Sequence, residues 1–230
     1  MAAVSAAGGT ITMLIGAVLL RLTVTDTYRR YVKGGLGVWL TIAGIAIIVL
    51  GLVTLVRALR RTPADHGHEH DHGIGVGWLL LAPIAALLLV APPTLGSYGV
   101  DRAANVKIKA GGGVFKKLKR GAPPLEMSLL EFGQRAYDHH GTSFNGAPVK
   151  LVGFVAGDVD GGFELARYQI SCCAADAEPI VIRVLGTSGD PPSRDQWVTV
   201  TGTFKPGGGD IPDLNSTSVV QIPAPNDPYE

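Results

Sequence analysis

The chain has 230 residues, of which 47 % are hydrophobic, and its net charge is +1. This length allows one compact domain or two small ones. Its only two cysteines, Cys172 and Cys173, are adjacent, which excludes a disulfide framework and leaves the redox compartment undetermined. The composition changes near Asp101, from Leu, Ile and Gly before it to Lys, Asp, Pro and short β-branched runs after it.

Three stretches within the first hundred residues contain no charged side chain: 1–20, 34–56 and 73–100. About twenty apolar residues suffice to cross a bilayer. A soluble protein can bury one such helix, but three would leave no polar helix faces to cover them. We therefore predict a multi-pass protein of the cell membrane, with a transmembrane domain over 1–97 and helices at about 9–25, 35–56 and 74–95.

Lysine and arginine positions bear on retention and orientation. No basic residue precedes the first apolar run, and Arg29, Arg30 and Lys33 follow it, which suits a retained helix better than a cleaved signal. With the amino terminus outside, these residues would lie in the cytoplasm and the arginines of 57–61 outside. The number of basic residues in the short segments that flank the helices favours a cytoplasmic C-terminal domain, although whole domains can translocate regardless of charge.

A glycine stripe runs along the second predicted helix. Gly37, Gly44 and Gly51 recur every seven residues, and the first helix offers a shorter stripe that includes Gly9 and Gly16. Such stripes let a neighbouring helix approach closely. The partner is the first helix or another protein, unless the glycines only reflect their general frequency in membrane helices.

The stretch 65–72, DHGHEHDH, separates the second and third predicted helices and is dense in metal ligands. Neutral imidazole binds zinc, copper, nickel or cobalt, and alternating spacing in a loop lets two or three rings converge. We predict that this loop binds zinc or another transition metal through its four histidines: His66, His68, His70 and His72. The alternative is a solvated polar loop.

A basic linker is predicted over 98–126, after the third helix. It contains the cations Lys107, Lys109, Lys116, Lys117, Lys119 and Arg120. Beside a membrane, such a cluster favours contact with anionic lipid headgroups over nucleic acid.

A soluble domain is predicted over 127–230. It begins with a short amphipathic helix at 128–138, capped by Ser128, and continues as a β domain over 147–224. Five short strands separated by Gly, Asp and Pro turns match a small five-stranded barrel of the oligonucleotide/oligosaccharide-binding (OB) type. A sandwich fragment is the second choice. The predicted fold class is thus membrane α plus soluble β, with an OB-like barrel.

The adjacent cysteines are the second metal candidate. Consecutive strand residues face opposite sides, so Cys172 and Cys173 can both reach one metal only where the strand ends or bulges. Asp176 would then join them, with Glu178, His139 or His140 as further ligands. Packing of one cysteine in the barrel and the other at its rim, or reversible thiol chemistry, are the alternatives.

No catalytic motif is present: the chain lacks a phosphate-binding glycine loop, HExxH and GxSxG. Arg135, Tyr137 and Asp138 are interpreted as the polar side of the short helix. We therefore predict that the protein is not an enzyme.

Four segments together with the three apolar runs and the His-rich loop resemble the YcgQ-type family, a poorly characterised bacterial family described as permease subunits. They are LVGFV at 151–155, RYQISCCAADAEP at 167–179, QWVTVTG at 196–202 and NDPYE at 226–230. The resemblance implies a small membrane protein that works beside a larger multispanning permease, and it carries over no catalytic residues.

Three helices without a charge near their middle are too few for most transport pathways. We therefore expect an accessory subunit of a permease for a transition-metal ion, zinc by preference. Two alternatives stay open: a membrane-anchored OB-like module that binds a peptide or nucleic acid, and a thiol-redox protein. Phe154, Phe163 and Tyr168 are too few for a nucleic-acid face and are expected in the core, so no nucleic acid partner is expected.

Overall fold

The computed structural model describes residues 2–60, 94–103, 115–187 and 191–230, with side chains from Gly8 onward. The chain divides into two compact units. The first comprises Met1–Arg29 and Gly34–Pro93, and the second comprises Arg30–Lys33 and Thr94–Glu230. Several predicted features lie outside the described residues: His66, His68, His70, His72, Lys107, Lys109 and nearly all of the third predicted helix.

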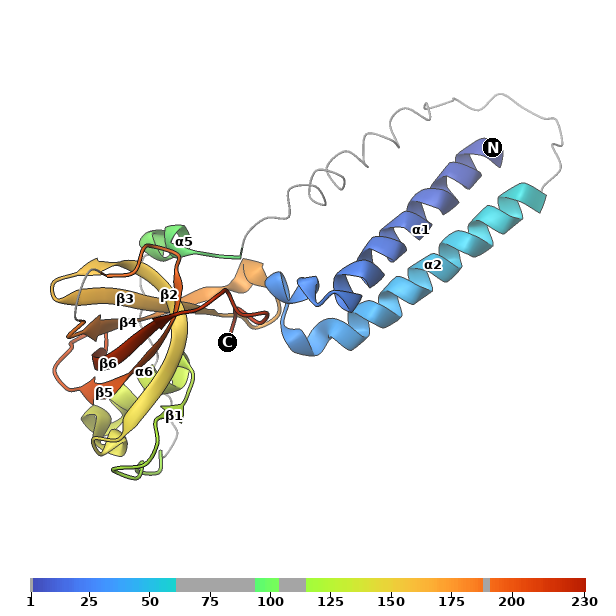
Figure 1. Cartoon of the computed structure of the whole chain (residues 1–230). Helices are drawn as coiled ribbons and strands as arrows, with labels where there is room; N and C mark the ends of the chain where they lie inside the picture. Colours follow the sequence, from blue (N-terminus) through green and yellow to red (C-terminus); the bar gives the residue numbers. More distant parts are fainter. Residues whose placement is uncertain (1, 61–93, 104–114, 188–190) are drawn as a thin grey trace. The chain divides into compact units, whose positions relative to one another are not determined.

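The first unit contains two antiparallel helices, α1 (Ala2–Val24) and α2 (Gly37–Arg60), which pack along their lengths (Figure 1). Gly34–Arg60 is long and apolar enough to cross a membrane, and 11 % of its most apolar window is buried. The apolar stretch Gly8–Val24 is shorter. One helix of the described chain thus meets the criteria for a membrane span, which a signal sequence or a core helix also meets. The three predicted crossings stay a prediction.

Glycines form the seam between α1 and α2. Gly9 lies against Gly51, and Gly16 lies against Gly44. A Cβ atom on Gly16 would lie 2.9 Å from the carbonyl oxygen of Gly44 and 2.7 Å from Cγ1 of Ile48. Because only glycine permits this backbone approach, the predicted stripe has α1 as its partner.

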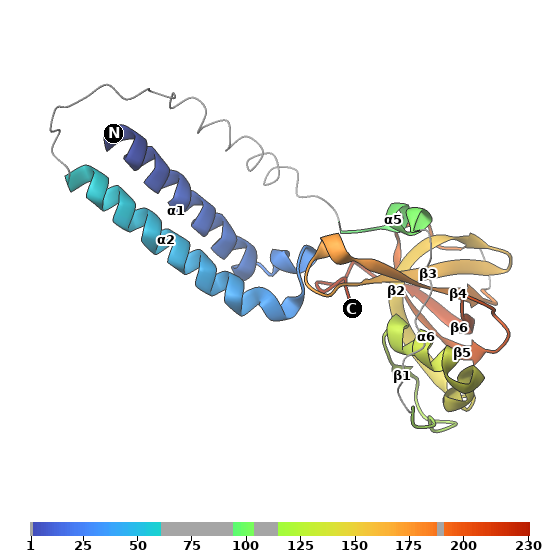
Figure 2. The same ribbon diagram turned by 180° about the vertical axis from the view of Figure 1, so that it is seen from behind.

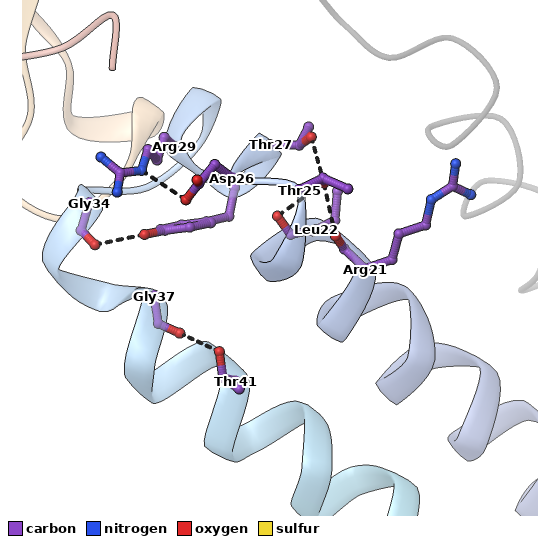
Figure 3. Close-up of polar contacts among 10 residues, drawn as sticks. Arg21, Leu22, Thr25, Asp26, Thr27, Arg29, Gly34, Gly37 and Thr41 are labelled. Carbon is purple, nitrogen blue, oxygen red and sulfur yellow. Dashed lines mark hydrogen bonds and ion pairs between the residues drawn. The ribbon is translucent and has the colours of Figure 1, made fainter. Parts of the chain in front are cut away.

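The connection between the helices is closed by local polar contacts (Figure 3). The hydroxyl and the backbone N–H of Thr25 both donate to the carbonyl oxygen of Arg21 near the end of α1, at 2.8 Å and 3.0 Å. The buried Tyr28 hydroxyl donates to the carbonyl oxygen of Gly34 at 2.9 Å. A Cβ atom on Gly37 would collide with that hydroxyl, so this glycine makes room for the tyrosine rather than for a helix.

The second unit is built on a six-stranded mixed sheet. Its strands are β1 (Leu125–Glu126), β2 (Pro148–Val159), β3 (Gly162–Gln169), β4 (Glu178–Leu185), β5 (Trp197–Lys205) and β6 (Asp213–Gln221). The order is β1-β2-β3-β4-β6-β5, and β2 also pairs with β5. Strand pairing therefore runs from β2 through β3, β4, β6 and β5 back to β2. β1–β2 and β4–β6 are parallel, and the other pairs are antiparallel. The five strands predicted from alternation correspond to β2–β6, whereas two-residue β1 has no period to detect.

Alternate strand residues supply two apolar clusters. Ile182 and Val184 of β4 lie in one cluster with Leu129 of α6 (Leu129–Tyr137). Val181, which precedes Ile182 in sequence and faces the opposite side of the sheet, lies in the other cluster with Trp197. Both views show α6 against the sheet, and the short helix α5 (Ser97–Arg102), which is also part of the second unit, contacts β2 (Figures 1 and 2).

Helix α6 begins as predicted but differs in its polar side. The Ser128 hydroxyl accepts the N–H of Glu131 at 2.9 Å, which confirms the cap. Arg135, predicted on the polar side, is instead buried. Its Nε donates to Glu131 Oε1 at 2.8 Å, its Nη1 donates to the carbonyl oxygen of Lys116, and the guanidinium lies 4.7 Å from the ring centroid of Phe115. Its burial follows from the segment that crosses over α6, which helical periodicity does not reveal.

Candidate metal centre

The adjacent cysteines lie in the loop between β3 and β4. The pattern FELARYQISC predicts a strand over 163–172, but β3 ends at Gln169, and a single 3-10 turn, η4 (Ala174–Asp176), precedes β4. The chain therefore leaves the strand before the cysteines. This break is the condition under which both side chains can face one ion.

Three predicted ligands meet in this loop. The Sγ atoms of Cys172 and Cys173 lie 3.6 Å apart, and with a carboxylate oxygen of Asp176 all three ligand atoms lie within 4.8 Å of one another. Cys172 is exposed and Cys173 is half-buried. Among the described residues, this is the group of three or more metal-ligating side chains that the fold assembles. We call it the Cys–Cys–Asp cluster.

The other proposed ligands of this centre lie elsewhere. His139 and His140 belong to η3 (Asp138–Phe144), where both have left-handed backbone conformations with φ of 46° and 54°. His140 lines a pocket with Tyr137 and Phe204. Glu178 begins β4 and is outside the cluster.

Asp176 holds the backbone of the loop. Its Oδ1 accepts the N–H of Ser171 at 2.9 Å, and its Oδ2 accepts the N–H groups of Cys172 at 2.8 Å and Cys173 at 3.4 Å. Hydrogen bonds from the Cys172 side chain and from these backbone groups lower the pKa of Asp176 to about 2. The stabilising contacts of this carboxylate are therefore present above its ordinary pKa of 3.8 and are lost as the pH falls toward about 2.

The same carboxylate keeps its neighbouring thiol protonated. The hydrogen bond to Asp176, with a smaller contribution from Cys173, raises the pKa of Cys172 from 9.0 to about 11. A metal ion must displace this proton, since the thiolate is the ligand. A carboxylate offers about four lone-pair sites, and three N–H groups reach Asp176. Because the Cys172 thiol is a fourth donor to this carboxylate, a cation would take the place of the thiol proton.

The C-terminal segment, including NDPYE, packs beside this loop. Arg167 of β3 donates through Nη2 to the carbonyl oxygens of Asp227 at 2.8 Å and Tyr229 at 3.3 Å. Tyr229 pairs with Tyr168 in a parallel bridge. Arg167 and Asp176, which both belong to the segment RYQISCCAADAEP, thus each hold backbone in place.

Sequence reasoning missed one neighbour of the cluster. Val32, which follows α1 in the chain, forms an antiparallel bridge with Cys173. No signal in the sequence links these positions, because a single bridge 141 residues apart has neither period nor motif.

The second unit is thus a small mixed β domain with one exposed and one half-buried thiol in a loop that a carboxylate holds. Residues 131–230 match the model of the DUF1980 C-terminal domain, a family of uncharacterised function. The match contains the Cys–Cys–Asp cluster, Arg167 and the NDPYE segment. No curated protein and no solved structure matches the chain.

Proposed function

We propose that the protein is an accessory subunit of a membrane permease for a transition-metal ion, with zinc as the preferred ion. In this proposal the chain crosses the membrane three times and carries a cytoplasmic OB-like barrel that holds the Cys–Cys–Asp cluster. A larger multispanning permease subunit is the partner, as the resemblance to the YcgQ-type family implies.

The spacing of the two sulfurs carries the metal assignment. Two thiolates on one tetrahedral zinc, each about 2.3 Å from the ion, lie about 3.8 Å apart. The Sγ atoms of Cys172 and Cys173 lie 3.6 Å apart without a metal. Zinc binding therefore needs deprotonation of the thiols but little movement of the loop.

The proposed barrel rests on strand order. The circuit β2-β3-β4-β6-β5-β2, with β4 parallel to β6, is the order expected of a five-stranded OB-like barrel. The proposed membrane location rests on Gly34–Arg60 and on the glycine seam, since close approach through small residues is typical of membrane helices.

The two alternative functions have weaker support. Reactive cysteines have lowered pKa values, whereas Asp176 raises the pKa of Cys172 to about 11, which disfavours rapid thiol-redox chemistry. Binding of single-stranded nucleic acid uses exposed aromatic rings. Phe154, Phe163 and Tyr168 are 2 %, 0 % and 4 % exposed and belong to the core.

Zinc binding by the purified full-length chain tests the proposal. Equilibrium dialysis in detergent at pH 7.5 would compare the wild type with a Cys172→Ser/Cys173→Ser variant and with a variant in which the four loop histidines are replaced by Ser. We expect each variant to lose part of the bound zinc and the combined variant to lose nearly all of it. In cells, both variants should weaken zinc uptake or tolerance.

The matched control for the cysteine pair is Ser171→Ala, which keeps both thiols and the Ser171 N–H that Asp176 accepts. This variant should bind zinc like the wild type. Equal zinc binding by the wild type and the combined variant would overturn the proposed role of metal binding. Resistance of the protein to carbonate extraction would test its membrane location separately.

A further inference from the structure

The backbone of the Cys–Cys–Asp cluster is paired with the chain between α1 and α2. The N–H of Ala174 donates to the carbonyl oxygen of Tyr31 at 2.7 Å, and the N–H of Lys33 donates to the carbonyl oxygen of Cys172 at 3.1 Å. Val32 stands opposite Cys173 between these two bonds. Arg30–Lys33 accordingly belong to the second unit, although α1 precedes them and α2 follows them in the chain.

Two further contacts fix this four-residue segment. Lys33 Nζ donates to the carbonyl oxygen of Ile170 at 3.4 Å. The Tyr229 hydroxyl donates to the carbonyl oxygen of Arg30 at 2.9 Å. Both ends of Arg30–Lys33 are therefore held, one by the cysteine loop and the other by the C-terminal segment.

The paired groups are the peptide units of the ligands themselves. The carbonyl of Cys172 and the N–H of Ala174 flank Cys173. The backbone torsions that orient the two sulfurs therefore also orient these two hydrogen-bonding groups. Since the sulfurs already have nearly the separation that zinc requires, a bound ion would restrict these torsions in the paired conformation. Formation of a disulfide, with sulfurs about 2.05 Å apart, would instead require them to move.

We propose that a metal ion on Cys172 and Cys173 strengthens the backbone pairing with Tyr31–Lys33, so that occupancy of the cluster is transmitted to the segment that joins α1 to α2. This inference rests on the proposed metal binding and adds its regulatory output. Because coupling between two sites is reciprocal, the pairing must strengthen metal binding by the same factor by which the metal strengthens the pairing.

Hydrogen exchange of the full-length chain in detergent, with and without zinc chloride, measures the first direction. We expect zinc to slow exchange at Lys33 and Ala174 by about fivefold or more, as a stabilised backbone hydrogen bond requires. The Cys172→Ser/Cys173→Ser variant should show no such change. Amides in the β5–β6 ladder, away from the loop, serve as internal reference.

A pair of substitutions at one position measures the reverse direction. Lys33→Pro removes the N–H that donates to Cys172, whereas Lys33→Ala removes the ammonium group but keeps that N–H. We expect Lys33→Pro to weaken zinc binding at the cluster by about fivefold, the worth of one backbone hydrogen bond. The zinc affinity of Lys33→Ala should stay within about twofold of that of the wild type, since the lost contact is one hydrogen bond from an exposed lysine.

The outcomes separate this inference from the proposed function. Zinc that binds through the cysteines without slowing exchange at Lys33, and with equal affinity in Lys33→Pro, would overturn the coupling and leave the metal site intact. Absence of cysteine-dependent zinc binding would overturn both. The exchange measurement uses the wild type, so it decides the question even where Lys33→Pro perturbs folding.

Discussion

Glu230 caps the helix that begins at Leu129: its Oε1 accepts the backbone N–H of Leu129 at 2.7 Å. Its Oε2 accepts the next N–H, of Leu130, at 3.0 Å. The side chain is 7 % exposed, and burial raises the pKa of this carboxyl although these N–H groups and Arg167 favour its charged form. A residue 101 positions away therefore satisfies two donors at the start of α6.

We expect Glu230→Ala to lower the free energy of unfolding of the second unit by about 2 kcal/mol, because two buried donors lose their acceptor. Glu230→Gln keeps one carbonyl oxygen and should cost about half as much. Urea unfolding followed by Trp197 fluorescence, in a Trp39→Phe/Trp78→Phe background, measures both. Identical midpoints for the alanine variant and its parent would show that the contact does not stabilise the domain.

The glycine seam gives a second prediction with a neighbouring control. Gly16→Ala places a methyl group 2.7 Å from Ile48 Cγ1 and 2.9 Å from the Gly44 oxygen, whereas a Cβ atom on Gly8 meets nothing within 4 Å. Overpacking should lower the stability of the helix pair by about 1–3 kcal/mol, against a gain of up to about 1 kcal/mol in helix propensity that both changes share.

Thermal unfolding of the detergent-solubilised protein, followed by helical circular dichroism, should therefore show a lower midpoint for Gly16→Ala and an equal or higher midpoint for Gly8→Ala. A Gly16→Ala protein as stable as Gly8→Ala would mean that α1 and α2 do not pack through their glycines in solution.

The local sequence pattern predicted the helices and strands of this fold better than it predicted which elements pack against one another. Period-two alternation predicted β2–β6, and Ser128 marked the start of α6. The spacing of the glycines predicted a close approach of another helix but not that this helix is α1, because a stripe of small residues does not identify the partner that packs against it. For a related reason the helical period predicts Arg135 on the polar side of α6: it cannot reveal the segment of Phe115 and Lys116 that covers this side chain.

In the candidate site, sequence reasoning grouped Cys172, Cys173 and Asp176 because ligand chemistry and short spacing place them in one turn. It extended β3 too far, since residues 170–172 retain strand-forming character and the break depends on the hydrogen bonds that Asp176 accepts. The pairing of Val32 with Cys173 was beyond prediction, because it depends on where the whole chain returns.

The last prediction concerns the reactivity of Cys172 without metal. With its pKa raised to about 11 by the hydrogen bond to Asp176, about one thiol in a thousand is ionised at pH 8. Asp176→Asn removes that charge, so the pKa should fall toward its ordinary 9.0 and the thiolate fraction should rise by up to about a hundredfold. Intrinsic nucleophilicity falls with the pKa, so the alkylation rate should rise by about tenfold.

Iodoacetamide labelling of zinc-free protein, with each cysteine resolved by peptide mass mapping, measures this rate. In the wild type the rate at Cys172 should climb until about pH 11, because a raised pKa keeps the thiol protonated below it; in Asp176→Asn it should level off nearer pH 9. Glu178→Gln, which removes a nearby exposed acid outside the cluster, should leave the profile unchanged. Equal profiles in Asp176→Asn and the wild type would show that the carboxylate does not hold the thiol protonated, and that the metal need not displace a strongly held proton.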